Sequence, residues 1–151
     1  REKQKAKRYY GISEKQFRRY FGEAEKAKGI SGENLLRMLE LRFDNVIYTL
    51  GYASSRREAR HLVKHGHFSV NGVSVDIPSY LLKKGDVIQV KDSSRQMNKI
   101  MGSVEGVSKR VVPSWLEADH ANFKGTVKDM PARDEISVPV EENMIVEYYS
   151  R

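Results

Sequence analysis

The spacing of apolar residues changes at Gly66, and this change restricts the possible fold more than any other feature. Before Gly66, apolar residues recur every three or four positions, a period that predicts helices. After it, the segment HFSVNGVSVDI alternates apolar and polar residues around Asn71-Gly72, which is the strongest short signal for a β-hairpin. The sequence therefore predicts an α+β fold, with helices first and then a small, mostly antiparallel sheet.

Capping residues and glycines mark the ends of the predicted helices. Ser13 with Gln16, and Ser55 with Glu58, have the spacing of a capping box at a helix start. Glycine is frequent just past a helix end, so it marks the other boundary. We predict a short basic helix or an arm over 1–11. Helices are predicted over 13–29, 31–50 and 55–66, with a break near 41–44 where the apolar phase shifts.

The same patterns predict the elements that follow the first hairpin. A Lys-Gly-Asp turn leads into a strand over 87–90, and residues 97–104 return to helical spacing. Residues 113–131 predict a second, looser hairpin. The tail over 141–149 fits either a helix or a strand, and two glutamates in a first turn favour the helix.

Positive charge is concentrated in the first half of the chain. Residues 1–67 hold 16 Lys and Arg against 8 Asp and Glu, whereas residues 68–151 hold 11 against 12. This asymmetry is typical of proteins that bind a polyanion, either nucleic acid or an anionic membrane surface, although soluble proteins can also be mildly basic. No apolar run has the length of a membrane span, and the absence of cysteine excludes disulfides and thiolate metal sites.

The helix predicted over 55–66 carries its cations on one side. Ala59, Leu62 and Val63 share a face that packs inward. The other side has two adjacent rows, Arg56, Arg60 and Lys64 in one and Arg57, His61 and His65 in the other. A solvated helix face is the alternative, but such faces mix charges and only Glu58 is acidic here. We therefore favour RNA binding through phosphates and unpaired bases.

The first twenty residues interleave cations with aromatic rings. The cations are Lys3, Lys5, Lys7, Arg8, Lys15, Arg18 and Arg19, and the rings are Tyr9, Tyr10, Phe17 and Tyr20. This mixture suits phosphate contact together with base stacking. The alternative is an aromatic core flanked by cations, which we expect for Phe17 and Tyr20 and leave open for Tyr9 and Tyr10.

Catalysis and metal binding have little support in the sequence. The spacing of His61, His65 and His67 could bring them to one metal ion, but neighbouring cations would repel it. There is no glycine-rich phosphate loop, no Gly-x-Ser-x-Gly and no prominent carboxylate pair, and we interpret Asp44 as a helix-end or surface carboxylate. We expect a protein that is not an enzyme and that needs no cofactor.

A resemblance to a known family rests on the run RFDNVIYTLGYASSRREARHLVKHGHFSVNGVSVDIPSYLLKKGDVIQV, residues 42–90. It resembles the alpha-L RNA-binding motif, in which two helices precede a Val-Asn-Gly hairpin and a Gly-Asp turn into a last strand. The flanks REKQKAKRYYGISEKQFRRYF and WLEADHANFKGTVKDMP are similar to the family of the bacterial small-subunit ribosomal protein number four. That family begins with another few dozen residues, so we expect this chain to lack them.

The resemblance implies a fold and a set of partners. A helical domain would be built from both chain ends, 1–42 plus 130–151, and would carry an inserted α+β domain over 43–129 with the motif at about 43–90. The partners would be the 5′ domain of small-subunit (16S) ribosomal RNA at a multi-helix junction, neighbouring small-subunit ribosomal proteins and, in several bacteria, the messenger of its own operon. The place would be the small ribosomal subunit in the cytoplasm, with no membrane.

The resemblance also implies two groups of RNA-binding residues. The motif's RNA-facing positions fall on Ser55, Arg56, Arg57, Arg60, His61, Lys64, His65 and His67, with Asn71 and Gly72 shaping the hairpin beside them. The family's basic N-terminal helices give a second group, Lys3, Lys5, Lys7, Arg8, Tyr9, Lys15, Gln16 and Arg19.

Two other classes of protein share the motif. Pseudouridine synthases and tyrosyl-transfer-RNA synthetases carry it beside a large catalytic domain, which 151 residues without a catalytic constellation cannot house. Free-standing motif proteins that bind stalled or stressed ribosomes would not be expected to carry the KQKAKRYYG segment or the hairpin around Trp115.

Overall fold

The computed structural model describes residues 1–106 and 111–150. The chain forms two compact units: the helical unit, Arg1–Glu40 with Pro131–Arg151, and the mixed unit, Leu41–Met130. The chain thus leaves the helical unit after Glu40 and returns to it at Pro131. Within the described residues, every helix is too short or too polar to traverse a bilayer.

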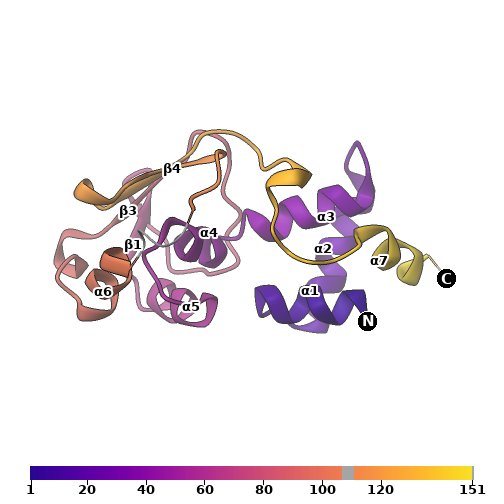
Figure 1. Cartoon of the computed structure of the whole chain (residues 1–151), viewed down its shortest axis with the longest axis horizontal. Helices are drawn as coiled ribbons and strands as arrows, with labels where there is room; N and C mark the ends of the chain where they lie inside the picture. The colour runs from indigo at the N-terminus through magenta and orange to yellow at the C-terminus, as the bar shows by residue number, and fades with distance from the viewer. Residues whose placement is uncertain (107–110, 151) are drawn as a thin grey trace. The chain divides into compact units, whose positions relative to one another are not determined.

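The helical unit contains α1 (Glu2–Tyr10), α2 (Glu14–Lys26), α3 (Ser31–Glu40), the 3-10 turn η4 (Arg133–Glu135) and α7 (Glu142–Tyr149). Figure 1 shows α1 to α3 in indigo and violet and α7 in yellow, so this unit joins the two ends of the chain. The helix favoured for the tail is confirmed by α7. Its Tyr149 ring stacks on Phe21 with centroids 4.5 Å apart. The close approach of α7 to α3 requires Gly32, where a Cβ would lie 2.9 Å from Glu142 Cγ.

The end of α2 differs from the prediction, which placed it at Gly29. The helix ends at Lys26, and Ala27 is its C-terminal cap. The reason is a contact from α3, because Asn34 Nδ2 donates hydrogen bonds of 3.2 Å to the carbonyls of Ala24 and Lys28. The first of these bonds satisfies the Ala24 carbonyl, which a longer helix would have satisfied internally.

The mixed unit packs helices against a five-stranded sheet (Figure 1). Its elements are α4 (Phe43–Leu50), α5 (Arg56–Lys64), β1 (Phe68–Val70), β2 (Val73–Ser74), β3 (Val87–Val90), η1 (Asp92–Ser94), α6 (Asn98–Gly106), β4 (Leu116–Asp119), η3 (His120–Asn122) and β5 (Lys124–Val127). The strand order is β2-β1-β3-β5-β4, and each pairing is antiparallel. The α+β class predicted from the sequence is confirmed.

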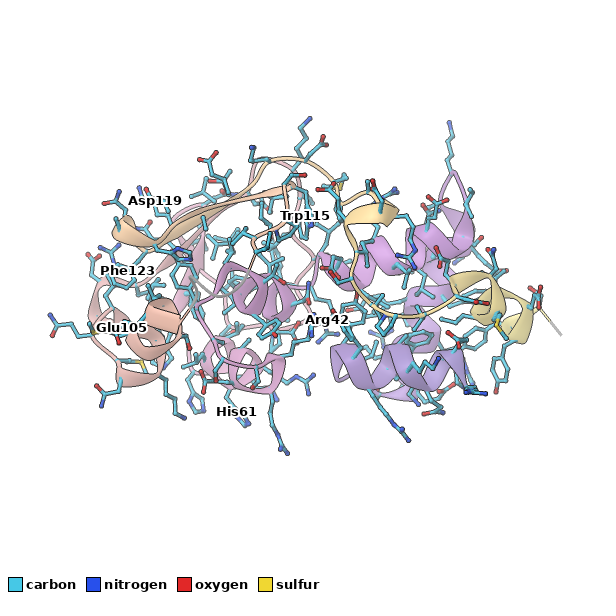
Figure 2. The ribbon with its side chains drawn as sticks, viewed as in Figure 1. Arg42, His61, Glu105, Trp115, Asp119 and Phe123 are labelled. Atoms are coloured by element: carbon cyan, nitrogen blue, oxygen red, sulfur yellow. The ribbon has the colours of Figure 1, made fainter. Side chains whose placement is uncertain are left out.

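Both predicted hairpins are present in this sheet. Asn71 and Gly72 turn the first one, with φ values of 51° and 81°, the positive values that a two-residue hairpin turn of this type needs. The second hairpin joins β4 to β5, and Asp119 and Phe123 lie at its turn (Figure 2). At Gly125 in β5 a side chain would collide with Leu50 of α4, so the sheet and this helix are in close contact.

Candidate nucleic-acid interface

The basic helix α5 begins at the N-cap residue Ser55, and Glu58 bonds the residue just before this cap. Ser55 Oγ accepts a 3.0 Å hydrogen bond from the Glu58 amide, and Glu58 Oε1 accepts one of 3.1 Å from the Ser54 amide. On its inner face Ala59, Leu62 and Val63 are buried in the core of the mixed unit. The local signals of the sequence therefore fix both the start of α5 and the face that it buries.

Two arginines of α5 have partners on α4. Arg56 Nε donates a 2.8 Å hydrogen bond to Asn45 Oδ1, and its guanidinium lies 4.7 Å from the centroid of the Tyr48 ring. Arg60 Nε lies 3.6 Å from Asp44 Oδ2. These arginines hold α5 against α4, a role that the sequence analysis did not foresee because the partners belong to a different helix.

Asp44 lies in the first turn of α4, as expected for a helix-end carboxylate. It is buried, so the alternative expectation of a surface carboxylate is wrong. Its side chain is 2% exposed and accepts two hydrogen bonds from Arg42, with lengths of 2.9 and 3.1 Å. The amide of Asn45 donates a further bond of 2.7 Å to it. A buried carboxylate needs this compensation for its lost hydration. Glu58 is consequently not the only acid that balances the charge of α5.

The exposed side of α5 carries a second set of basic side chains, which we call the outer row. It consists of Arg57, His61, Lys64 and His65, all of them exposed. In the described part of the chain, no carboxylate lies within ion-pair distance of Arg57 or Lys64. Concentrated, uncompensated positive charge of this kind favours an anionic partner.

His67 follows α5 and is only half-buried. Its Nδ1 lies 2.8 Å from Ser94 Oγ, within hydrogen-bond distance. Burial lowers the pKa of His67, and so do the neighbouring positive charges of His65 and Lys91. The ring is therefore neutral at pH 7 and fixed by its bond to η1.

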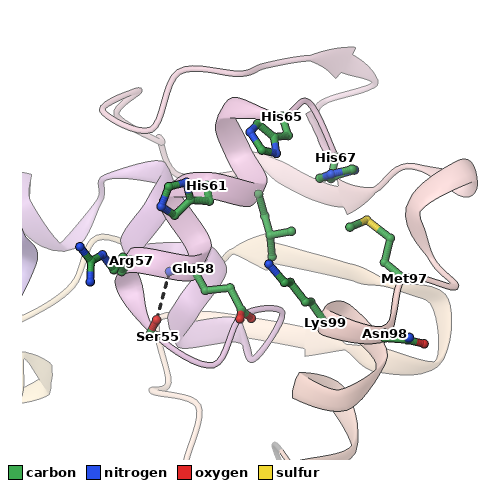
Figure 3. Close-up of a pocket in the computed structure, with 10 residues that line it drawn as sticks. Ser55, Arg57, Glu58, His61, His65, His67, Met97, Asn98 and Lys99 are labelled. Atoms are coloured by element: carbon green, nitrogen blue, oxygen red, sulfur yellow. Dashed lines mark hydrogen bonds between the residues drawn. The ribbon is translucent and has the colours of Figure 1, made fainter.

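A groove of about 660 Å³ lies beside the outer row (Figure 3). One wall comes from α5 and His67, and the other comes from Met97, Asn98 and Lys99 at the start of α6. The sequence analysis missed these three residues. The apolar spacing over residues 97–104 predicts a helix, but no nearby residue shows that this helix begins opposite α5.

The hairpin residues Asn71 and Gly72 are exposed at a tip that the protein itself stabilises. Asn71 Nδ2 donates to Asp86 Oδ1, and Asn71 Oδ1 accepts from the Val87 amide, both at 2.9 Å. The side chain of Asn71 thus shapes the turn, while the backbone at Gly72 supplies its second positive φ.

The N-terminal group divides into internally paired and exposed residues. Lys3 and Lys7 bind Glu14 at 3.0 and 2.9 Å, and Lys5 binds Glu2 at 3.0 Å. The bond from Lys7 is the main reason that the pKa of Glu14 falls to about 2, with a further contribution from Lys3. Exposed side chains are those of Arg8, Lys15 and Arg19, whereas Tyr9 and Gln16 are half-buried.

The aromatic residues of the same segment belong largely to the core. Phe17, Tyr20 and Tyr10 are buried, and Tyr10 donates a 2.6 Å hydrogen bond to Glu40 Oε2. The core assignment of Phe17 and Tyr20 is confirmed, and Tyr10 joins them. Beside this core, α2 presents a shallow hollow of about 500 Å³ lined by Glu14, Lys15, Arg18 and Arg19.

The histidines do not form a metal centre in the described residues, where no three His, Asp or Glu side chains are grouped as metal ligands. The ring centroids of His61 and His65 are 6.4 Å apart, and so are those of His65 and His67. Three imidazoles therefore follow one another along the groove with their ring planes at large angles.

Comparison with known proteins covers both units. Residues 1–40 match the model of the "Ribosomal protein S4/S9 N-terminal domain", and residues 41–88 match that of the "S4 domain". The chain is 66% identical over 151 residues to small ribosomal subunit protein uS4A of Bdellovibrio bacteriovorus, covering 100% of this chain and 73% of that protein. It is 59% identical to uS4 of Rubrobacter xylanophilus, over 99% of this chain and 74% of the relative, and 59% identical to uS4 of Acetivibrio thermocellus, over 100% and 73%.

The resemblance found in the sequence is thereby confirmed. Identity above one half holds over 150 or 151 residues of this chain, and each relative is matched over more than two thirds of its length. This chain belongs to the family of the small ribosomal subunit protein uS4.

Proposed function

We propose that this chain is a structural ribosomal protein that binds small-subunit ribosomal RNA directly and promotes assembly of the subunit, without a catalytic step. The observation that carries the proposal is the outer row of α5, four exposed basic side chains on a helix whose other cations are held by α4. Membership of the uS4 family supports it. The place of action would be the small ribosomal subunit in the bacterial cytoplasm.

The RNA site proposed here is the 5′ domain of 16S ribosomal RNA. Neighbouring small-subunit proteins would be further partners, and the messenger of the protein's own operon would be a regulatory target. These finer assignments rest on the family resemblance of the sequence. Both the motif residues around α5 and the N-terminal group would contact the RNA.

The proposed contacts divide according to what each side chain already binds. The outer row would face phosphates and unpaired bases, because side chains cannot reach base edges in the deep groove of an A-form helix. In the helical unit, Arg8, Lys15 and Arg19 are exposed and would contact the backbone directly. Lys3 and Lys7 keep their bonds to Glu14 and would add positive potential at longer range.

Filter binding against a 5′-domain RNA fragment tests the proposal, with transfer RNA and a random duplex as competitors. If six or more phosphates are neutralised, affinity falls roughly a thousandfold between about 50 and 200 mM salt. Tight binding that survives both competitors is the expected result. Equal affinity for all three RNAs would contradict a specific ribosomal role, and a flat salt curve would contradict phosphate binding altogether.

A further inference from the structure

The groove beside α5 is an open hollow on the surface of the mixed unit. Leu62 lies buried along its α5 side, and Met97 enters from the opposite wall (Figure 3). Its volume of about 660 Å³ falls within the range of roughly 300 to 1,000 Å³ that is usual for small-molecule sites. The groove is therefore large enough to hold a small molecule or a single nucleotide.

Flat rings and soft apolar groups make up much of its lining. The ring planes of His61 and His65 meet at 59°, and those of His65 and His67 at 71°, so these imidazoles do not stack on one another. Histidine is among the side chains on which unpaired bases stack. The thioether of Met97 also packs well against aromatic rings. This lining suits a planar aromatic ligand.

His67 gives that lining a fixed element. Its contact with Ser94 Oγ at 2.8 Å holds the ring, and its lowered pKa keeps it uncharged at pH 7. A neutral ring can approach an apolar surface without losing the hydration of a charge. The remaining polar groups of the groove belong to Ser55, Arg57, Glu58, Asn98 and Lys99.

Those polar groups suit the other parts of a nucleotide. Arg57 and Lys99 bring positive charge from the two walls, and both can bind phosphate oxygens. Asn98 offers an amide donor and acceptor, the pair that the edge of a base requires. The one carboxylate of the groove, Glu58, already accepts a hydrogen bond from the Ser54 amide.

We propose that this groove receives one unpaired base of the bound RNA, which stacks on His65 with its edge towards His67 while its phosphate lies between Arg57 and Lys99. The inference rests on the proposed function, since the RNA must be bound for its base to enter. The occupant is a nucleotide of the RNA chain and not a free nucleotide, because the groove lies beside an outer row whose exposed cations suit a longer backbone.

Methyl NMR of the full chain tests this proposal. The protein is labelled with carbon-13 at its five methionine methyl groups and titrated with the 5′-domain RNA fragment. A base in the groove shifts the Met97 methyl signal upfield through the ring current. Met101 is the matched control, because it lies on α6, is exposed and does not line the groove. An RNA that binds without moving Met97 would overturn the inference and leave the proposed function standing.

Abasic substitution of unpaired nucleotides, one at a time, identifies the base. At one position the Met97 shift should disappear and binding should weaken roughly 5- to 150-fold, the factor for one stacked base. If AMP or CMP alone moved Met97 as far as the RNA does, the groove would be a small-molecule site and the inference would be wrong. Failure of the RNA to bind at all would instead overturn the proposed function, and the inference with it.

A pair of variants at His65 distinguishes stacking from charge. His65 is exposed, so both variants should fold. His65→Phe keeps a flat ring and should retain the affinity and the Met97 shift, whereas His65→Ala should lose both. Equal losses in the two variants would show that His65 acts as a cation, which would contradict stacking.

Discussion

The carboxylate of Asp44 lies between two guanidinium groups, with Arg42 at 2.9 Å and Arg60 at 3.6 Å. Arg42 is as deeply buried as Asp44, whereas Arg60 reaches in from α5 and remains about one third exposed. Removing one member of a buried ion pair leaves the other charge without compensation. Asp44 therefore determines both the stability of the mixed unit and the orientation of its basic helix.

Asp44→Asn should lower the free energy of unfolding by about 3–5 kcal/mol, the usual cost of breaking a buried pair. Urea denaturation followed by fluorescence measures this change. The matched control is Asp92→Asn, because Asp92 also pairs with an arginine, Arg95 at 3.1 Å, but is 91% exposed. The control should cost less than about 1 kcal/mol, and equal losses in both variants would contradict a special role for Asp44.

Arg57 and Arg60 both lie on α5, yet replacing Arg57 by alanine should affect RNA binding, whereas replacing Arg60 should affect stability. Arg57→Ala removes an exposed cation, so stability should hold while the slope of log affinity against log salt falls by about one. Arg60→Ala removes a partner of Asp44 and should cost about 1–3 kcal/mol of stability. Thermal unfolding and RNA titration on both proteins would decide, and a destabilised Arg57→Ala would refute the assignment.

The arginines of α5 show what the sequence can and cannot predict about single residues. Helical spacing shows that Arg56, Arg57 and Arg60 avoid the apolar face of α5, and it assigns them to RNA contact alike. Which of them meets α4 depends on how the two helices pack, and that information is not local to either segment. The side of α5 on which each arginine lies was therefore predictable from the sequence, whereas the partner of each arginine was not.

At the scale of elements, Glu14 links the first two helices of the chain. Lys3 and Lys7 on α1 both bind this residue at the start of α2, with Nζ–carboxylate distances of 3.0 and 2.9 Å. Bonds from both lysines stabilise the ionised carboxylate, which is why its pKa falls from 4.5 to about 2. The contribution of this link to stability must therefore depend on pH.

Glu14→Gln should lower stability by about 1 kcal/mol at neutral pH, a modest cost because the group is partly exposed. The folded pKa is depressed, so the contribution is complete above about pH 4.5 and disappears as the pH falls towards 2. Urea denaturation of both proteins at several pH values measures the difference. A gap that stayed constant from pH 7 to pH 2 would contradict the role of the carboxylate charge.

The first hairpin has a turn that two substitutions can separate into its parts. Asn71→Gly keeps the positive φ and removes the side-chain bonds to Asp86 and Val87, which should cost about 1–3 kcal/mol. Asn71→Ala loses the same bonds and adds roughly 1 kcal/mol of backbone strain. Urea midpoints report both values. An alanine variant as stable as the glycine variant would show that the turn conformation contributes nothing.

Elements were more predictable than single contacts when their signals were local. The Asn71-Gly72 turn, the N-terminal cap at Ser55 and the break between α3 and α4 all depend on a few adjacent residues, and the structure confirms each of them. The groove was not predictable, because α5 and Met97–Lys99 reach it from segments separated by three strands and a 3-10 turn. The end of α2 was missed for the same reason.

At the scale of the whole molecule, the mixed unit begins and ends beside one short loop. The Leu82 amide donates a 2.9 Å hydrogen bond to the Leu41 carbonyl, and Lys84 lies 3.8 Å from Asp129. Both ends of Leu41–Met130 thus contact residues 82–84, so the unit needs no other part of the chain to close. We propose that it is an inserted domain that folds independently.

The fragment 41–130 should consequently unfold in one cooperative transition. Trp115, the single tryptophan of the chain, is buried in the core of this unit and reports its packing by fluorescence. The complementary control is the variant Trp115→Phe in the full chain. Because Trp115 belongs to the mixed unit, the circular dichroism signal of the helical unit should not change at low denaturant. A fragment with the tryptophan emission of an unfolded chain would contradict independent folding.

The stacking of Tyr149 on Phe21 has a consequence for the order in which the protein folds during its synthesis. Translation delivers residues 1–40 before α7, so their core lacks this helix until residue 149 has been added. The mixed unit is complete once Met130 has emerged, so it can fold while the earlier helices still wait for their final partner. Domains usually mature in the order of synthesis, and here residues 1–40 are made before the mixed unit but acquire their native neighbours after it.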